Sequence, residues 1–186
     1  MHHATNVEIG GSSPSGGTNA LYNTIYRKPI IMCLKAKIKE MGGFVSFITG
    51  GWASAITLAP FGIYVKKDYL PPYWDYKRLE NHESIHWAQQ MEMIVAGAII
   101  AAITVGILLL FGISSWWLLT SLAFPFLFFY LWYVIEWFIR IFINGSKAYK
   151  SLCFEREAYQ NDDNLDYLKT RKRFSFLKYI FGETLN

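Results

Sequence analysis

Charged residues and histidines are scarce in this chain of 186 residues. Only 17% of the residues are charged while 53% are hydrophobic, and the chain holds four histidines. A soluble domain usually has a larger charged fraction, so we expect one domain, or one domain with a membrane element. The lysines and arginines are spread over both ends without a basic block among aromatic residues, which argues against nucleic acid as a partner.

Cysteine is equally sparse, with Cys33 and Cys153 as the two examples. They make neither a disulfide framework nor a Cys-x-x-Cys zinc site, so we expect packed thiols in a reducing compartment. Residues 1–20 are polar and rich in glycine and serine, without the apolar run of a secretory signal. We therefore expect a flexible leader over residues 1–20 and a single domain over residues 21–186.

Residues 94–139 contain none of the 18 lysines and arginines. Within them, residues 94–113 form an uncharged run whose helical length, at ~1.5 Å per residue, is roughly 30 Å and matches a bilayer core. A second apolar run covers residues 116–143, with Pro125 as an expected kink. The two runs predict a transmembrane helical hairpin; a buried hairpin in a soluble protein is the alternative.

The charges around this hairpin set its expected orientation. Lysines and arginines lie on both sides of it and are missing from the turn at residues 114–115, so the positive-inside rule places both ends in the cytoplasm. We expect the cytoplasmic (inner) membrane, with the active site on its cytoplasmic side, lipid as a partner and the basic residues 169–173 near anionic headgroups. Gly97 and nearby alanines form a small-residue strip suited to close helix contact.

The first part of the chain carries weaker signals. Apolar residues at helical spacing predict an amphipathic helix over residues 20–41 that ends at Gly42 and Gly43, either on a membrane surface or against the body. Residues 44–65 are interrupted by glycine and proline and predict short strands, with Pro60 at an edge or bulge. An edge strand there could hold an extended peptide, or could simply cover the next helix.

The main chemical signal is the run His-Glu-Ser-Ile-His over residues 82–86, on a helix expected to begin near Leu79. Residues four apart share one face of a helix, so the imidazoles of His82 and His86 can meet one metal ion. Glu83 lies about 100° further round the helix. There it can reach a water on the metal as a general base.

A catalytic zinc site needs three protein ligands and one open position. No histidine follows residue 86 in the sequence, so the third ligand is expected to be a carboxylate. Glu155 and Glu157, in a predicted helix after the hairpin, are the candidates, with Glu136 as a further one. Glu136 also stands four residues before Arg140, and the two form either a functional group in a cavity or an ordinary ion pair at the interface.

The His-Glu-x-x-His motif and the later Phe-Glu-x-x-Ala motif at Glu155 resemble those of the gluzincin class of zinc metallopeptidases. Two predicted membrane helices between the motifs give a layout similar to HtpX-like and CAAX-processing membrane proteases. Over residues 55–180 the chain looks like a small bacterial group with a His-Glu-x-x-His-x-x-Gln motif. The resemblance implies Glu155 as the third ligand and Tyr159 where larger enzymes carry an aspartate that orients a ligating histidine.

These expectations combine into one fold and one function. The expected fold is mainly α with a small β element, a zincin-like pair of site helices and the transmembrane hairpin, in a metallopeptidase-like domain. The expected activity is that of a zinc metalloendopeptidase acting on a peptide or protein substrate. His82, His86 and Glu155 are the expected metal ligands, and Glu83 is the expected general base.

Two further points complete the predicted site. Zinc is preferred over other divalent ions because of the ligand types. Tyr149 or Tyr159 is expected to donate a hydrogen bond to the oxyanion. The alternative function is that of a non-catalytic membrane protein, in which the same residues form a structural metal site or a degenerate peptidase site.

Overall fold

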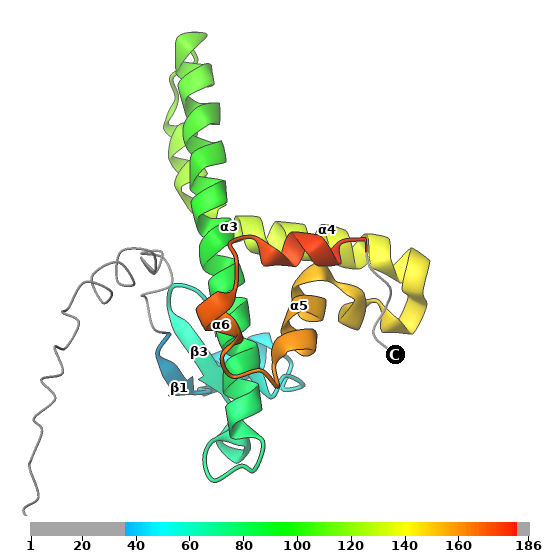
Figure 1. The fold of residues 1–186 in the computed structure, drawn as a ribbon. Helices are drawn as coiled ribbons and strands as arrows, with labels where there is room; N and C mark the ends of the chain where they lie inside the picture. The colour runs from blue at the N-terminus through cyan, green and yellow to red at the C-terminus, as the bar shows by residue number, and fades with distance from the viewer. Residues whose placement is uncertain (1–35, 182–186) are drawn as a thin grey trace, which may run out of the picture. The chain divides into compact units, whose positions relative to one another are not determined.

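The computed structural model describes residues 36–181. Most of this part is helical, with a small sheet beside the first half of the longest helix (Figure 1), so the predicted mainly α fold with a small β element is confirmed. The sheet consists of β1 (Ile38–Glu40), β2 (Ala55–Leu58) and β3 (Gly62–Val65), in the order β1-β3-β2. β1 is parallel to β3 and β2 is antiparallel to it, which makes β2 an edge strand of the described sheet.

β1 corrects the prediction of a helix over residues 20–41, of which residues 20–35 lie outside the described part. The local pattern also fits a strand, because the exposed Lys37 and Lys39 flank the half-buried Ile38 at a period of two. The parallel pairing with β3 then decides the conformation.

The prediction of short strands over residues 44–65 is confirmed for β2 and β3 but is wrong for the short helix α2 (Gly43–Ile48). Pro60 lies in the turn between β2 and β3 instead of at an edge or bulge. The N–H of Phe61 closes this turn on the C=O of Leu58 at 2.7 Å. A turn accommodates proline because no ladder hydrogen bond is needed there.

The longest element is α3 (Tyr76–Leu110), a single helix of 35 residues that follows the short η2 (Lys67–Tyr69). The metal motif and the first predicted membrane run therefore lie on one continuous helix, which begins before the expected start at Leu79. Its polar half, residues 76–93, buries hydrophilic side chains, and its apolar half, residues 94–110, exposes hydrophobic ones. The buried hydrophilic residues are Asn81, His82, Glu83, His86, Gln89, Gln90 and Glu92.

After α3 the chain turns and continues as the 3-10 segment η3 (Trp116–Ala123) into α4 (Phe124–Asn144). Pro125 lies in the first turn of α4, where its missing N–H removes no helical hydrogen bond. The second apolar run changes direction at this point, from η3 beside α3 to α4 across it (Figure 1), so the predicted kink is confirmed. Gly97 of α3 meets this turn. A Cβ at residue 97 would lie 2.9 Å from the Cα of Pro125, so the small residue permits the close approach that the sequence suggests.

The path of the chain around Gly97 has two parts. After α3, the chain returns beside the apolar half of this helix as η3. At Gly97 it then begins α4, which crosses α3 instead of lying antiparallel to it (Figure 1). Two helical stretches are long and apolar enough to cross a membrane: α3, and Leu118–Lys147, which includes the end of η3 and all of α4. The second long helix is thus not the return arm of a simple hairpin.

The remaining elements pack against α3 and α4. η4 (Gly145–Lys147) and η5 (Tyr149–Ser151) lead to α5 (Cys153–Asn161), which is followed by α6 (Tyr167–Thr170) and η6 (Ser175–Tyr179). One apolar cluster joins α3, α4, α5 and η6, and consists of Met93, Phe129, Cys153, Phe154 and Phe176. Cys153 is therefore a packed free thiol, as expected, while Cys33 lies outside the described residues.

Candidate metal centre

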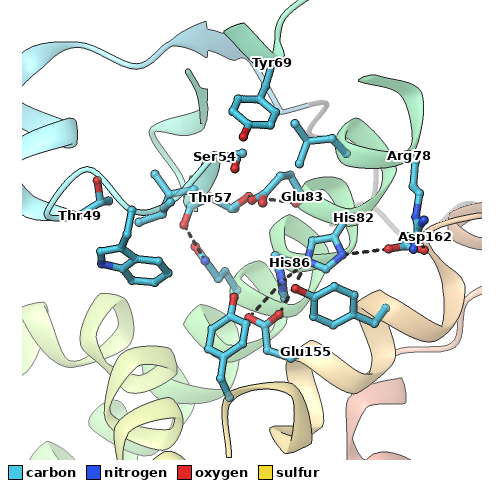
Figure 2. A pocket seen from close by; sticks show the side chains of 18 of the residues that line it. Thr49, Ser54, Thr57, Tyr69, Arg78, His82, Glu83, His86, Glu155 and Asp162 are labelled. Carbon is cyan, nitrogen blue, oxygen red and sulfur yellow. Dashed lines mark hydrogen bonds and ion pairs between the residues drawn. The ribbon is translucent and has the colours of Figure 1, made fainter. Parts of the chain in front are cut away.

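The three predicted metal ligands meet in the structure (Figure 2). His82 and His86 project from one face of α3, and their Nε2 atoms lie 3.1 Å apart. Glu155 comes from the first turn of α5, and its carboxylate oxygens lie 3.8 Å from His82 Nε2 and 3.5 Å from His86 Nε2. All three residues are buried, and their ligand atoms lie within 4.8 Å of one another.

These separations suit one small cation. Zinc binds imidazole nitrogen and carboxylate oxygen at about 2.0–2.2 Å with tetrahedral geometry, which places neighbouring ligand atoms roughly 3.3–3.5 Å apart. The two Nε2 atoms are 3.1 Å apart, and each imidazole lies near a different oxygen of Glu155, at 3.5 Å for His86 and 3.8 Å for His82. The group could therefore hold a metal ion.

Gln89 fixes the tautomer of His86. Its Nε2 donates to the C=O of Phe154 at 3.0 Å and to Glu157 Oε2 at 2.9 Å, so its Oε1 must be the atom that faces the imidazole. That oxygen lies 2.8 Å from His86 Nδ1 and can only accept, which places the proton of the neutral ring on Nδ1. In this neutral tautomer, the Nε2 of His86 presents a lone pair to the site.

Asp162 orients His82 in the same way. Its Oδ2 lies 3.4 Å from His82 Nδ1, and its Oδ1 pairs with Arg78 Nε at 3.1 Å. Burial acts to raise the pKa of Asp162, but its hydrogen bonds with His82 and Arg78 outweigh burial and hold the pKa below its usual value. Asn81 holds the turn that carries Asp162 by donating its side-chain amide to three backbone carbonyls there.

Asp162 corrects one consequence drawn from the resemblance. By that resemblance, Tyr159 stands where the larger enzymes carry an aspartate, which implies that the orienting carboxylate is missing. The structure supplies that carboxylate from Asp162 instead. The ring of Tyr159 packs edge-on against the imidazole of His82, with the ring centroids 4.7 Å apart.

The two imidazoles and the carboxylate of Glu155 lie so close together that a positive charge between them would stabilise the site. With the Nδ1 atoms of His82 and His86 protonated, the lone pairs of both Nε2 atoms point into the same small space. Glu155 adds a carboxylate whose Oε2 is buried without a hydrogen-bond partner among the described residues. Burial acts to raise the pKa of Glu155, but the rings of His86 and His82, when they carry a second proton, lower it below its usual value. Burial likewise acts to lower the pKa of His86, but the charge of Glu155 raises it to about 9. Either a proton on a ring or a bound metal ion satisfies this arrangement.

Glu83, the predicted general base, lies on the wall of the cavity that contains the three ligands, with a volume of about 600 Å³. Its Oε2 accepts a hydrogen bond from Thr57 Oγ1 of β2 at 2.7 Å (Figure 2). Gln90 fixes β2 in turn, since its Nε2 donates to the C=O of Thr57 at 2.8 Å and its Oε1 accepts from the N–H of Ala59 at 2.7 Å. The edge strand thus holds Glu83, whose catalytic role stays a prediction.

Tyrosine hydroxyls surround Glu155. Tyr133 of α4, which sequence reasoning missed, donates to Glu155 Oε1 at 3.1 Å. Tyr149 and Tyr159, the two predicted donors, line the cavity. Burial and the charge of Glu155 raise the pKa of Tyr149 and raise that of Tyr159 to about 12, so both hydroxyls keep their protons near neutral pH.

Glu157, left open as a third ligand, is engaged elsewhere. It is completely buried and pairs with Arg171 Nε at 2.7 Å. Arg171 Nη1 also pairs with Glu92 of α3 at 2.5 Å, so the arginine clamps α3 to α5. Its pKa, which burial acts to lower, is raised by the hydrogen bonds with Glu92 and Glu157. Glu157 therefore supports the site helices without reaching the imidazoles.

Glu136, the other open candidate, forms an ion pair with Arg140 at 3.2 Å. Its Oε1 also accepts the backbone N–H of Cys153 at 2.9 Å, which caps the first turn of α5. The pair is thus a structural contact that positions the helix carrying Glu155. Among the described residues, the three-residue group at the imidazoles takes its carboxylate from Glu155.

No protein-family model matches the chain, and neither a curated protein nor a solved structure matches it. The gluzincin resemblance and the zincin-like helix pair therefore stay predictions. Their support is the sequence motif together with the geometry of α3 and α5 described above.

Proposed function

We propose that this chain is a membrane-associated zinc metallopeptidase of the gluzincin type. The observation that carries the proposal is the convergence of two imidazole rings and one buried carboxylate beside Glu83 in one cavity. Three protein ligands with an open fourth position are typical of catalytic zinc sites, whereas structural sites use four. The two long apolar helices support the membrane association.

The residues of the site take distinct roles in this proposal. Zinc held by the three ligands would supply a water with a pKa of about 7 and a Lewis acid for the peptide carbonyl. Glu83, held by Thr57, accepts a proton from the attacking water and returns it to the leaving amine. The protonated hydroxyls of Tyr149 and Tyr159 are the donors for the oxygen that gains negative charge.

The edge of β2 supports a peptide as the substrate. Gln90 already occupies the C=O of Thr57 and the N–H of Ala59 on the outer side of this strand. Because backbone groups alternate between the two sides of a strand, Ala55 turns its N–H and C=O to the same outer side. Ala53 and Ala55 line the cavity, so an extended peptide can pair with this stretch and pass the metal ligands.

Variants of the full-length protein in lipid nanodiscs test the proposal. Each is stripped of metal, reloaded with zinc, and assayed for zinc content and for cleavage of a fluorogenic peptide mixture. Glu83→Gln should keep its zinc and lose roughly 10²–10⁴-fold in turnover, because only the general base is removed. Glu155→Ala should lose both zinc and turnover. Glu80→Gln, on the same helix with a side chain paired to the exposed Lys77, is the matched control and should resemble the parent.

Two outcomes would contradict the proposal in different ways. A parent protein that binds zinc but cleaves no peptide, with Glu83→Gln unchanged in every property, would favour the structural metal site. Full zinc content in Glu155→Ala would show that the third ligand is another residue.

A further inference from the structure

α4 is amphipathic, with its polar face turned to the protein and its apolar face turned outward. Its polar side chains, Tyr133, Glu136 and Arg140, lie on the face that contacts the protein. The opposite face is exposed along the whole helix and is apolar, with Leu127, Leu131, Ile135, Phe138 and Phe142 among its residues. Monomeric soluble proteins rarely expose a continuous apolar surface of this length, so the outward face indicates a hydrophobic surrounding.

The inward face of α4 is covered by the body of the protein from its second turn onward. Phe129 packs on Phe154 of α5, with ring centroids 4.5 Å apart, and Glu136 accepts the N–H of Cys153 at 2.9 Å. Near the other end, Arg140 donates to the C=O of Ile180, just after η6. α4 therefore has protein on one side along most of its length.

The segments that cover α4 carry exposed charges. Lys172, Arg173 and Lys178 are exposed on and before η6, which runs beside α4 (Figure 1), and Lys147 and Lys150 are exposed just after its end. If α4 crossed a bilayer, this charged body would enter the hydrocarbon, where each charge costs several kcal/mol, ~2.5–3.5 on insertion scales. A bilayer on the outward side alone instead places these lysines and arginines near the headgroups, where anionic lipids attract them.

The apolar half of α3 behaves differently. Ile99, Ile103 and Ile107 are about half exposed, and in the described structure this half extends beyond the body with η3 beside it (Figure 1). α4 crosses α3 near Gly97, where the body ends. The two apolar segments therefore cannot both run along the normal of one membrane.

We propose that α4 lies in the plane of the membrane interface, with its outward face in the acyl chains of one leaflet, while the apolar half of α3 and η3 enter the bilayer beside it. The partner is a leaflet that contains anionic headgroups. This arrangement replaces two spanning helices by one inserted element and one interfacial helix. It holds the metal site at the membrane surface, because Tyr133 of the same interfacial helix contacts Glu155.

Depth measurements on the full-length protein test this arrangement. Cys33 is changed to Ser, single cysteines are placed at exposed positions, and each is labelled with an environment-sensitive fluorophore in phosphatidylcholine–phosphatidylglycerol vesicles. Quenching by lipids with spin labels near the headgroup or deep in the acyl chain gives the depth of each probe. Probes at Leu127, Ile135 and Phe142 of α4 should share one shallow depth. Probes at Ile99, Ile103 and Ile107 should become successively deeper.

The controls separate this proposal from its alternatives. A probe at the exposed Asp163 should show no quenching, and the Cys33→Ser parent measures any labelling of the buried Cys153. A shallow–deep–shallow profile along α4 would show that it spans the bilayer and would overturn the proposal. So would an absence of quenching along α4. Neighbouring positions such as Leu131 and Phe138 replace any variant that misfolds. Peptide cleavage enters none of these measurements, so the result is independent of the proposed enzymatic activity.

Discussion

The two halves of α3 share one continuous backbone and have opposite surroundings. The polar half is covered by the sheet, α5 and the C-terminal segments, and its hydrophilic side chains find partners there, as buried polar groups must. The apolar half exposes side chains such as Ile103, which is 58% exposed. The comparison teaches that the candidate metal site lies where the helix is covered by protein, and that the exposed apolar surface begins directly after it.

The largest effect is expected at the clamp that joins the polar half to α5. Arg171→Met would leave the carboxylates of Glu92 and Glu157 buried without their cation, so we expect a loss of about 3–5 kcal/mol in the free energy of unfolding. Denaturant unfolding in detergent measures it. Lys172→Met removes the same charge from an exposed neighbour and should change stability by less than about 0.5 kcal/mol. If both variants lost the same free energy of unfolding, the contacts of Arg171 with Glu92 and Glu157 would add nothing to stability.

Replacing an isoleucine by alanine in each half of α3 compares the packing of the two halves directly. Ile85 of the polar half is completely buried, so Ile85→Ala should cost about 2–5 kcal/mol through lost contacts and a cavity. Ile103→Ala in the apolar half removes an exposed side chain and should cost less than about 0.5 kcal/mol in the same unfolding assay. Similar losses at both positions would mean that the apolar half is packed against protein in the folded state.

Local signals in the sequence are sufficient to predict the metal ligands and the apolar half of α3. The four-residue spacing of His82 and His86 places both rings on one face of a helix, and the long uncharged run identifies the apolar half. The Glu-x-x-Ala motif pointed to Glu155, which the structure brings to the two rings. These features depend on residues that are near one another in the chain or belong to one motif.

The parts that depend on tertiary contacts could not be predicted from such signals. Tyr133 reaches Glu155 because α4 crosses over α5, and the contact of Asp162 with His82 depends on the turn held by Asn81. The change from predicted helix to β1 has the same origin, since strand pairing overrides a weak local pattern. The Gln that follows the motif at position 89 was visible in the sequence, but its role needs both of its partners on α5.

A smaller effect is expected at Gly97, on the boundary between the two halves. Gly97→Ala adds a Cβ that would lie 2.9 Å from the Cα of Pro125, so α4 must shift, and we expect a loss of about 1–3 kcal/mol. Gly106→Ala, with no atom within 4 Å of the added Cβ, is the matched control and should be neutral or stabilising by up to about 1 kcal/mol. Unfolding midpoints measure both, and a neutral Gly97→Ala would contradict the tight crossing.

The smallest effect on the fold, with a selective effect on the site, is expected from Asp162→Asn. The amide cannot orient His82 through a charged acceptor, so zinc affinity should fall roughly 10–100-fold in a competition assay with a chromophoric chelator. Asp163→Asn removes the same charge from a residue that is 82% exposed and lies 3.3 Å from the same Arg78, yet this residue does not orient a ligand. Any general electrostatic effect should therefore appear in both variants. A difference confined to Asp162→Asn would show that the polar half of α3 depends on its protein partners to present lone pairs to the metal, and equal affinities would remove that role from Asp162.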